Sequence, residues 1–283
     1  MKKIGILGTG NIGTDLLVKL IKLGYKDIAF VGRREDSEGI KFAKSLDIKT
    51  SIDGINYFKK NLDYDVVLDC TNAFDAKEHY SILKDLNIKV IDLTPAKIGQ
   101  ICVPSINGSD IQNYDNVNMI TCGGQASLPL INAISENVNS VSYIEVVSQI
   151  ASKSAGMSTR INIDNYIETT KYAICQFSKA KKCKVILNIN PAEPCVDMQT
   201  TVFMKIDNLS ELNFEKIVDK VYSRLKEIKE YVPYYELVMP PMITDNDILM
   251  LSVKVRGSGD YLPPYAGNLD IINCAAIKIL ENL

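Results

Sequence analysis

Short apolar runs alternate with amphipathic stretches from the start of the chain to Thr121. An apolar run predicts a buried strand, and apolar side chains three to four positions apart predict a helix. Strands and helices in regular alternation are typical of a doubly wound parallel sheet. The predicted strands are 3–8, 28–31, 65–69, 89–93 and 117–121, and the predicted helices are 12–23, 37–46 and 76–86.

After position 124 the predicted strands become longer and fewer helices separate them. This pattern indicates an open antiparallel or mixed sheet that helices cover on one face. We therefore predict an α/β protein with a Rossmann-type dinucleotide-binding domain over 1–124 and an α+β substrate and dimerisation domain over 125–268. A last helix, 269–283, is expected to pack back on the first domain. Further strands are predicted at 141–150, 184–189, 200–206, 235–239 and 249–255, and further helices at 125–137, 164–180 and 214–231.

Composition narrows the class of protein. The chain has 283 residues, of which 46% are hydrophobic and 23% charged, as in an ordinary globular protein large enough for two domains. A net charge of −2 gives no basic patch for nucleic acid, and no apolar stretch is long enough to span a membrane. Because the N-terminus runs directly into a strand, we expect no signal peptide and a cytoplasmic protein. The seven cysteines form no C-x-x-C pair and indicate neither a disulfide framework nor a metal site.

A glycine-rich turn joins the first predicted strand to the first predicted helix. It reads Gly8-Thr9-Gly10-Asn11-Ile12-Gly13, a G-x-G-x-x-G pattern in the strand-to-helix setting of a dinucleotide-binding loop. Glycines there allow a tight turn and let a pyrophosphate approach the amino end of the helix. We therefore expect these residues to bind a nicotinamide dinucleotide.

The end of the second strand bears on which dinucleotide binds. A carboxylate about 20 residues past the loop binds the ribose 2′-hydroxyl of NAD, whereas an arginine there accommodates the 2′-phosphate of NADP. This strand is followed by Arg33 and Arg34, and Glu35 and Asp36 come next. The arginines slightly favour NADP(H). The alternative is that both are solvated charges beside an NAD site.

Cys122 follows the last predicted strand of the first domain and precedes two glycines and a helix. The unpaired N–H groups and the dipole of that helix favour a thiolate there and can hold an oxyanion formed beside the sulfur. We interpret Gly123 and Gly124 as room for a substrate at the sulfur. The alternative is a buried structural cysteine.

The base that would ionise Cys122 is not obvious from the sequence. The single histidine, His79, lies in a helix expected at the surface, so a Cys-His dyad is not indicated. The thiolate would then depend on local electrostatics, to which Lys153 or Arg160 can contribute. Both are equally interpretable as solvated charges.

The chain carries several blocks of distinctive sequence: GTGNIGTDL at 8–16, IDLTPAKIGQICVP at 91–104, NMITCGGQASLP at 118–129, SKSAG at 152–156, TRINID at 159–164, NPAEP at 190–194 and DYLPPYAGNLDI at 260–271. Together they resemble the acylating acetaldehyde dehydrogenases, CoA-dependent enzymes paired with 4-hydroxy-2-oxovalerate aldolases. The resemblance covers nearly the whole chain. It implies a fold like those of glyceraldehyde-3-phosphate and aspartate-semialdehyde dehydrogenases, with Cys122 as acyl-thioester nucleophile and CoA as co-substrate.

The resemblance also implies which residues surround the cofactor. Besides Thr9 to Ile12 of the glycine-rich turn and Asn268 near the last helix, it points to one continuous stretch. This stretch consists of Ser154, Ala155, Gly156, Met157, Ser158, Thr159, Arg160, Ile161 and Asn162.

Some positions depart from the family pattern. Arg34 stands where the family has an aspartate, and Met157 and Ser158 replace a Pro-Gly pair. Gln199 and Thr200 replace an Arg-Asp pair whose aspartate is the family's proposed base.

The nearest carboxylate, Asp197, lies an odd number of positions before Thr200, so along a strand it points to the opposite face. The chain is also shorter than the family between Pro240 and Lys254, which leaves the acyl acceptor and an aldolase partner open.

We therefore predict an enzyme that interconverts a short-chain aldehyde and its acyl-CoA with NAD or NADP, through a thiohemiacetal and a thioester on Cys122. One alternative is a phosphorylating semialdehyde dehydrogenase, which needs a basic cradle that the residues beside Cys122 do not supply. Another is a nucleotide-binding regulatory protein that has lost activity, which Thr200 favours and the intact 121–125 block opposes. Long apolar strands in 125–255 predict a homodimer or a larger assembly.

Overall fold

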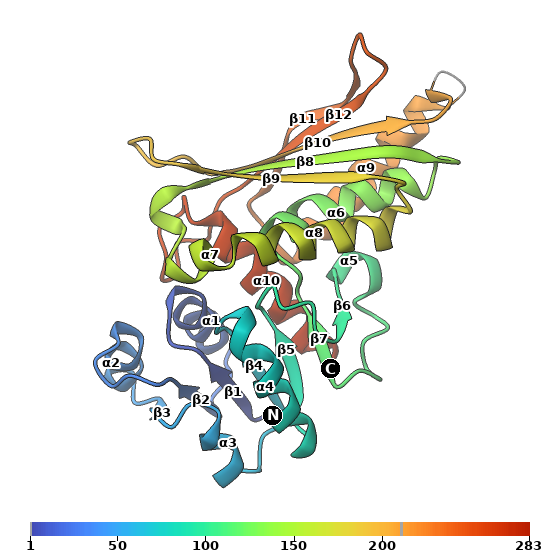
Figure 1. Ribbon diagram of the computed structural model, residues 1–283. Helices are drawn as coiled ribbons and strands as arrows, with labels where there is room; N and C mark the ends of the chain where they lie inside the picture. Colours follow the sequence, from blue (N-terminus) through green and yellow to red (C-terminus); the bar gives the residue numbers. More distant parts are fainter. Residues whose placement is uncertain (1, 210–211) are drawn as a thin grey trace.

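The computed structural model describes residues 2–209 and 212–283, which form two sheets with helices packed between and around them (Figure 1). The first sheet is parallel throughout, with strand order β3-β2-β1-β4-β5-β7-β6. This order confirms the predicted doubly wound, Rossmann-type sheet. Its strands are β1 (Ile4–Leu7), β2 (Ile28–Val31), β3 (Lys49–Ser51), β4 (Val66–Asp69), β5 (Lys89–Asp92), β6 (Gln100–Ile101) and β7 (Asn116–Asn118).

Strands β1, β2 and β4 are buried along their whole length because both faces of the sheet are covered. Alternate residues enter two different cores: Ile4, Phe30 and Leu68 lie in one, and Val31 and Val67 in the other. The helices of this part are α1 (Asn11–Lys22), α2 (Glu38–Ser45), α3 (Asn56–Lys60), α4 (Ala73–Asp85) and α5 (Pro104–Asn107).

The second sheet has the order β11-β12-β10-β8-β9, in which β8 and β9 are parallel and the other pairs antiparallel. It is the mixed sheet that the long strands predicted. Its elements, in chain order, are α6 (Cys122–Ser135), β8 (Val141–Ala151), the 3-10 helix η1 (Ser152–Ser154), α7 (Met157–Ile161), α8 (Ile163–Ser178), β9 (Cys183–Asn190), β10 (Met198–Ile206), α9 (Phe214–Tyr231), β11 (Tyr235–Ile243), β12 (Leu249–Val255) and α10 (Gly267–Asn282).

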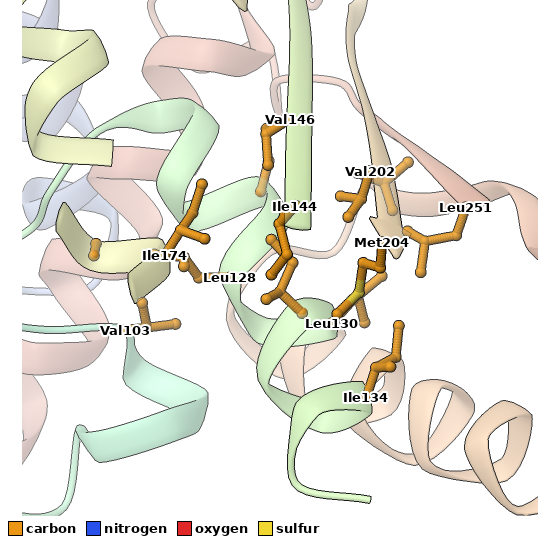
Figure 2. Packing of buried hydrophobic residues seen from close by; sticks show 14 of the residues in the cluster. Val103, Leu128, Leu130, Ile134, Ile144, Val146, Ile174, Val202, Met204 and Leu251 are labelled. Carbon is orange, nitrogen blue, oxygen red and sulfur yellow. The ribbon is translucent and has the colours of Figure 1, made fainter. Parts of the chain in front are cut away.

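Helices α6, α8 and α9 cover one face of this second sheet, and α6 and α8 lie between it and the first sheet (Figure 1). Figure 2 shows the contact: Leu130 of α6 lies toward Ile144 of β8 and Met204 of β10, and Leu128 lies beside Ile174 of α8. All of these side chains are fully buried. Within the described part of the chain, no helix packs on the opposite face of the sheet, as the sequence pattern predicted.

Helix α10 returns to the first sheet. Ile272 and Ile279 complete a core that Leu16 and Leu20 of α1 begin. Among the described residues, no helix has both the length and the apolar content needed to cross a membrane.

Most departures from the predicted elements lie at their ends. Strand β7 stops at Asn118 and α6 begins at Cys122, so a turn replaces the predicted strand residues 119–121. Residues 152–160, for which no helix or strand was predicted, contain η1 and the start of α7. Strands β3 and β6 and helices α3 and α5 were not predicted, because elements so short carry no clear hydrophobic period.

Candidate active site

The turn before Cys122 holds an unusual backbone conformation. Ile120 has a φ of +64°, in the left-handed region that a β-branched side chain rarely adopts. The side-chain oxygen of Asn118 accepts a hydrogen bond from the Ile120 N–H at 2.9 Å. The side-chain amide of Gln125 donates to the Met119 carbonyl at 2.9 Å. These bonds hold a strained turn directly ahead of the candidate nucleophile.

A buried carboxylate supports this turn. Asp92, at the end of β5, accepts hydrogen bonds from the Thr94 N–H at 2.8 Å and from the Asn118 amide at 2.9 Å. Burial and the neighbouring Asp69 carboxylate raise the pKa of Asp92 to about 7. Asp69 contacts Nδ1 of His79 at 2.8 Å. The expected surface position of His79 is therefore wrong: it is 6% exposed, because it lies under the strand ends as the partner of a carboxylate.

Cys122 is the first residue of α6 and is half-buried. Thr121 caps the helix through its hydroxyl, which accepts a hydrogen bond from the Gly124 N–H at 2.9 Å. Burial raises the pKa of the Cys122 thiol to about 11, although the Tyr166 hydroxyl and the N–H groups of Gly123 and Cys122 act in the opposite direction. The N–H groups at the helix terminus thus favour a thiolate, as expected, but desolvation outweighs them.

The two glycines after Cys122 make room for protein atoms. A Cβ on Gly123 would stand 2.0 Å from the Tyr166 hydroxyl oxygen and 2.8 Å from Ser148 Oγ. A Cβ on Gly124 would stand 2.8 Å from the Ile120 side chain. Our interpretation of the glycines as space for substrate is therefore wrong: close packing of α8, β8 and the strained turn requires them.

The two basic residues expected near the sulfur face elsewhere. Lys153 Nζ pairs with Glu193 Oε1 at 2.5 Å. Arg160 donates from Nε to the Ala155 carbonyl at 3.0 Å and from Nη2 to Ser152 Oγ at 2.9 Å. Neither contributes to the pKa of the Cys122 thiol, so the expectation that they help to ionise it is wrong.

The side-chain group that faces the sulfur is instead the hydroxyl of Tyr166. Tyr166 of α8 is 6% exposed, and burial together with the Cys122 thiol holds its pKa well above the usual value. Its oxygen completes no hydrogen bond of ordinary geometry with the described residues, although Cys122, Ser148 and the Gly123 N–H all face it. Ser148 Oγ lies 3.0 Å from Thr200 Oγ1. Thr200, where the resemblance implies an aspartate, thus belongs to a row of hydroxyls that leads to Cys122.

Helix α8 is bound to the start of α6 through threonines. Thr170 Oγ1 lies 2.7 Å from Thr121 Oγ1 and donates to the Tyr166 carbonyl at 2.7 Å. Thr169 donates to the Pro95 carbonyl of the first sheet's loops at 2.8 Å. These bonds fix the distance between Tyr166 and the nucleophile.

One cavity joins the two parts of the molecule beside Cys122. Its wall includes Ile12 of the glycine-rich turn, Thr159 and Asn162 of the predicted cofactor stretch, and Asn268 of α10. Asn268 is 1% exposed, and its Oδ1 has no hydrogen-bond partner among the described residues, so a ligand can supply one. No lysine, arginine, aspartate or glutamate of the described chain lines this cavity.

The glycine-rich turn takes its shape from two of its glycines. Gly8 has a φ of +113°, and a Cβ on Gly13 would stand 2.0 Å from the Gly8 carbonyl oxygen. Gly10 precedes α1, which begins at Asn11 with no side chain capping it. Thr9 Oγ1 lies 3.1 Å from the hydroxyl of Ser37, the residue before α2.

Other residues of the predicted cofactor stretch lie outside the cavity wall. Ser154 and Ala155 are buried beneath α7, and Gly156 precedes that helix. Met157 and Ile161 are 74% and 58% exposed. Ser158 belongs to α7, but its side chain lies outside the described part of the chain.

The charged residues that follow β2 differ in whether they form ion pairs with neighbouring helices. Arg33 Nη2 pairs with Asp75 Oδ2 in the first turn of α4 at 2.9 Å. Arg34 is exposed. Glu35 pairs with Lys44 of α2 at 3.0 Å, which directs its carboxylate toward that helix.

The sequence analysis missed Tyr166, Ser148 and Asn118. Tyr166 lies four positions from both Asn162 and Thr170, which places all of them along one side of a helix. This spacing of polar residues in the sequence predicts a polar face on the helix and could have identified Tyr166. Ser148 and Asn118 carried no such signal, because their roles depend on contacts between separate elements.

The chain matches two known domain families. Residues 122–263 match "Prokaryotic acetaldehyde dehydrogenase, dimerisation", and residues 3–114 match "Semialdehyde dehydrogenase, NAD binding domain". A solved structure of aspartate semialdehyde dehydrogenase II from Vibrio cholerae, complexed with ASA, has a TM-score of 0.66 at 13% identity. The match covers 99% of this chain and 97% of that one, which confirms the fold class.

Two curated relatives are much more similar in sequence. The acetaldehyde dehydrogenase of Spirochaeta aurantia is 51% identical over 99% of this chain and 93% of its own length. That of Burkholderia thailandensis is 50% identical over 99% and 94%. The chain therefore belongs to the acetaldehyde dehydrogenase family, as its sequence blocks predicted.

Proposed function

We propose that this protein is an acylating aldehyde dehydrogenase that interconverts a short-chain aldehyde and its acyl-CoA with NAD(P)(H). The observation that carries the proposal is the cavity in which the Cys122 thiol, Ile12 of the glycine-rich turn and the buried amide of Asn268 meet. The acetaldehyde dehydrogenases at 51% and 50% identity support it.

The residues present fit a nicotinamide dinucleotide. The tight turn at Gly8 and Gly13 leaves the amino end of α1 open to a pyrophosphate, and the unpartnered Oδ1 of Asn268 offers an acceptor deeper in the cavity. When bound there, the dinucleotide supplies a hydride acceptor for aldehyde oxidation and a donor for the reverse reaction. The match of residues 3–114 to an NAD-binding domain supports this assignment.

The chemistry on the protein takes place at Cys122. Its sulfur adds to the aldehyde carbonyl, which forms a C–S bond and leaves charge on the oxygen that N–H groups of the first turn of α6 can stabilise. Loss of hydride from this thiohemiacetal gives a thioester. The thiol of CoA then attacks the thioester, so that the acyl group moves to CoA and the Cys122 sulfur is released.

The cavity favours CoA over inorganic phosphate as the acyl acceptor. A phosphate that attacks the thioester needs positive side chains near the sulfur, and no lysine or arginine of the described chain lines the cavity. The thiol of CoA needs no such cradle at the point of attack. The phosphorylating alternative is therefore the weaker proposal.

Cofactor preference follows from the end of β2. Arg33 is held toward α4 by Asp75, and Glu35 is held toward α2 by Lys44, which leaves Arg34 as the charge for a 2′-phosphate. A charge-assisted hydrogen bond to that group contributes about 1.5–3 kcal/mol. We expect NADPH to be accepted at least as well as NADH.

The second part of the molecule supports a homodimer, since residues 122–263 match a dimerisation domain. The sheet face without helices carries half-buried apolar side chains, such as Val147 and Phe203, that a second copy would cover. We place the boundary between the cofactor domain and this domain at residue 124. An aldolase remains a candidate partner by resemblance only, and the short 240–254 segment argues against it.

The proposal is tested by replacing Cys122 with alanine and following NADH and NADPH consumption with acetyl-CoA and longer acyl-CoAs. Turnover should fall by about 10³-fold or more, because the variant lacks the sulfur that carries the acyl chain. Cofactor binding, measured by fluorescence titration, should not change.

The matched control is Cys195→Ala, which removes another half-buried thiol that lies outside the cavity wall. It should retain activity. Substantial turnover in Cys122→Ala would contradict the proposal. If the wild-type protein binds the dinucleotide but reduces no acyl-CoA, the regulatory alternative is correct.

A further inference from the structure

We propose that Tyr166 is a further catalytic residue, whose phenol stays protonated and donates a hydrogen bond to the Cys122 thiolate. The inference rests on the proposed function, because it concerns the same nucleophile. It assigns the stabilisation of that nucleophile to a neutral hydroxyl in addition to the helix terminus, where the sequence had suggested help from a lysine or an arginine.

The first support is the position of the phenol oxygen. A Cβ on Gly123 would stand 2.0 Å from Tyr166 Oη, so this oxygen lies directly against the backbone of the nucleophile's turn. Tyr166 is 6% exposed, and its hydroxyl completes no hydrogen bond of ordinary geometry among the described residues. A buried donor without a partner has a free-energy cost, which is removed when the facing thiol becomes a thiolate acceptor.

The second support is the direction in which the proton can move. Burial and the neighbouring sulfur hold the pKa of Tyr166 well above its usual value, so the phenol is a donor and not a base. The same contact lowers the pKa of the Cys122 thiol against the effect of burial. When the S–H bond breaks, the proton passes to water or buffer, and Tyr166 keeps its own proton throughout.

The third support is the row of hydroxyls behind the phenol. Ser148 faces Tyr166 from β8, and its Oγ lies 3.0 Å from Thr200 Oγ1 of β10. The ring itself is anchored because Thr170 of α8 bonds both to the Tyr166 carbonyl and to Thr121 beside Cys122. Ser148 and Thr200 are therefore positioning residues for the phenol.

The surroundings leave no competing charged group. Cys122 is faced by the Tyr166 hydroxyl and by backbone N–H groups, and Cys70 is the other titratable side chain among the described residues that line the cavity besides Cys122 and Tyr166. Burial raises the pKa of Cys70 well above its usual value, so it stays neutral. The charge on sulfur is thus controlled by neutral hydrogen-bond donors.

The test is the rate at which iodoacetamide alkylates Cys122 as a function of pH, followed by mass spectrometry of the Cys122 peptide. In Tyr166→Phe the apparent pKa of the thiol should rise by about one unit and alkylation at pH 8 should slow about tenfold, because one donor to the thiolate is lost. Ser148→Ala should give a smaller shift in the same direction.

The matched control is Tyr172→Phe, which removes a 41% exposed phenol from the same helix and should leave the profile of Cys122 unchanged. A Tyr166→Phe profile that coincides with that of the wild type, in a protein with an unchanged thermal melt, overturns the proposal. If Tyr166→Phe unfolds, Ser148→Ala is used for the test instead. An alkylation profile of Ser148→Ala that coincides with that of the wild type would then overturn the proposal.

The alkylation profile does not depend on turnover. If Cys122→Ala keeps its activity, the proposed function fails. The comparison of the wild-type and Tyr166→Phe alkylation profiles still shows whether Tyr166 stabilises the Cys122 thiolate.

Discussion

Two buried polar networks meet at the turn that carries Cys122, one from each sheet. The carboxylate network lies under the ends of β4 and β5, and the hydroxyl network lies between α8, β8 and β10. We define the former as Asp69, Asp92, His79 and Asn118, and the latter as Thr121, Ser148, Tyr166, Thr170 and Thr200.

The carboxylate network acts on the backbone of the turn, whereas the hydroxyl network reaches the sulfur through Tyr166. Asp92 reaches the turn only through Asn118, which holds the N–H of Ile120. Tyr166 faces the thiol directly. A carboxylate in contact with sulfur would disfavour a thiolate by charge repulsion, and a hydroxyl donor favours it. Because the two networks are separate, the first sheet can fix the geometry of the turn before Cys122 without repelling the thiolate that the hydroxyl network stabilises.

The sharpest way to break the hydroxyl network is Gly123→Ala. The added Cβ would stand 2.0 Å from Tyr166 Oη, so either α8 or the nucleophile's turn must move. We expect kcat/KM for acyl-CoA reduction to fall about 100-fold or more, since a shift near 1 Å has that effect on a reacting group.

Gly257→Ala is the control for that change, because its Cβ would approach Asp270 no closer than 3.4 Å. It should stay within a few-fold of the wild type. Near-normal kinetics for Gly123→Ala would mean that the hydroxyl network is not needed for catalysis.

Titration sharpens the comparison, because only the carboxylate network changes charge near neutral pH. The pKa of Asp92 is about 7 in the folded protein and about 4 when unfolded, so the folded state binds a proton more tightly between these values. Unfolding then releases a proton, and stability decreases as pH rises from about 4 to 7, by roughly 1 kcal/mol per pH unit.

Urea unfolding at several pH values measures this dependence. The groups that face Asp92 are Asp69, the Cys70 thiol beside it and, through Asp69, His79. Asp69→Asn removes the repelling charge and should flatten the slope. An equal slope in both proteins would show that the Asp69 charge does not raise the pKa of Asp92, and the absence of a slope in the wild type would show that Asp92 does not titrate in this range.

Asn118→Ala breaks the carboxylate network at its contact with the turn. Ile120 then loses the acceptor that holds its left-handed conformation, and relaxation of such strain is worth about 1–3 kcal/mol. Turnover should fall about 20-fold as Cys122 loses its fixed position.

Asn116→Ala serves as the control, since Asn116 is equally buried on β7 but has no bond to the turn. It should lower the free energy of unfolding but reduce turnover much less than Asn118→Ala does. If both variants lose turnover to the same degree, the effect of Asn118 is general destabilisation and not positioning.

Arg34→Asp tests a site outside both networks and should have the smallest effect. The preference for NADPH over NADH should shift about tenfold toward NADH in a fluorescence titration, because one charged donor to the 2′-phosphate is lost. The alkylation rate of Cys122 should not change. Much tighter binding of NADH than NADPH by the wild-type protein would show that Arg34 is only a surface charge.

The first sheet, apart from its edge strands β3 and β6, could be predicted from the sequence. Strands such as Ile4–Leu7 and Ile28–Val31 are buried on both faces, so they appear as continuous apolar runs. The boundaries of α9 and β12 also match the predicted 214–231 and 249–255. Short elements such as β6 were missed because two residues show no period.

The candidate site could be predicted only where its residues belong to local motifs. The glycine-rich turn, Cys122 and Asn268 were identified from sequence blocks. Tyr166 and Asn118 were not, because each matters through a contact with an element far away in the chain. The sequence also showed the helix terminus at Cys122 but not the desolvation that opposes it.

Helix α10 has a consequence for the order in which the protein matures. Its residues Ile272, Ala276 and Ile279 fill the core against Leu16 and Leu20 of α1, and Asp270 bonds to the buried Lys19 at 2.7 Å. Domains usually fold as units while the ribosome is still adding the next one. Here the first sheet leaves the ribosome early, but one side of its core stays open until the last helix has emerged. A nascent chain stalled before Asn268 therefore presents an apolar surface to chaperones, and the cavity wall beside Cys122 is completed only when α10 has emerged.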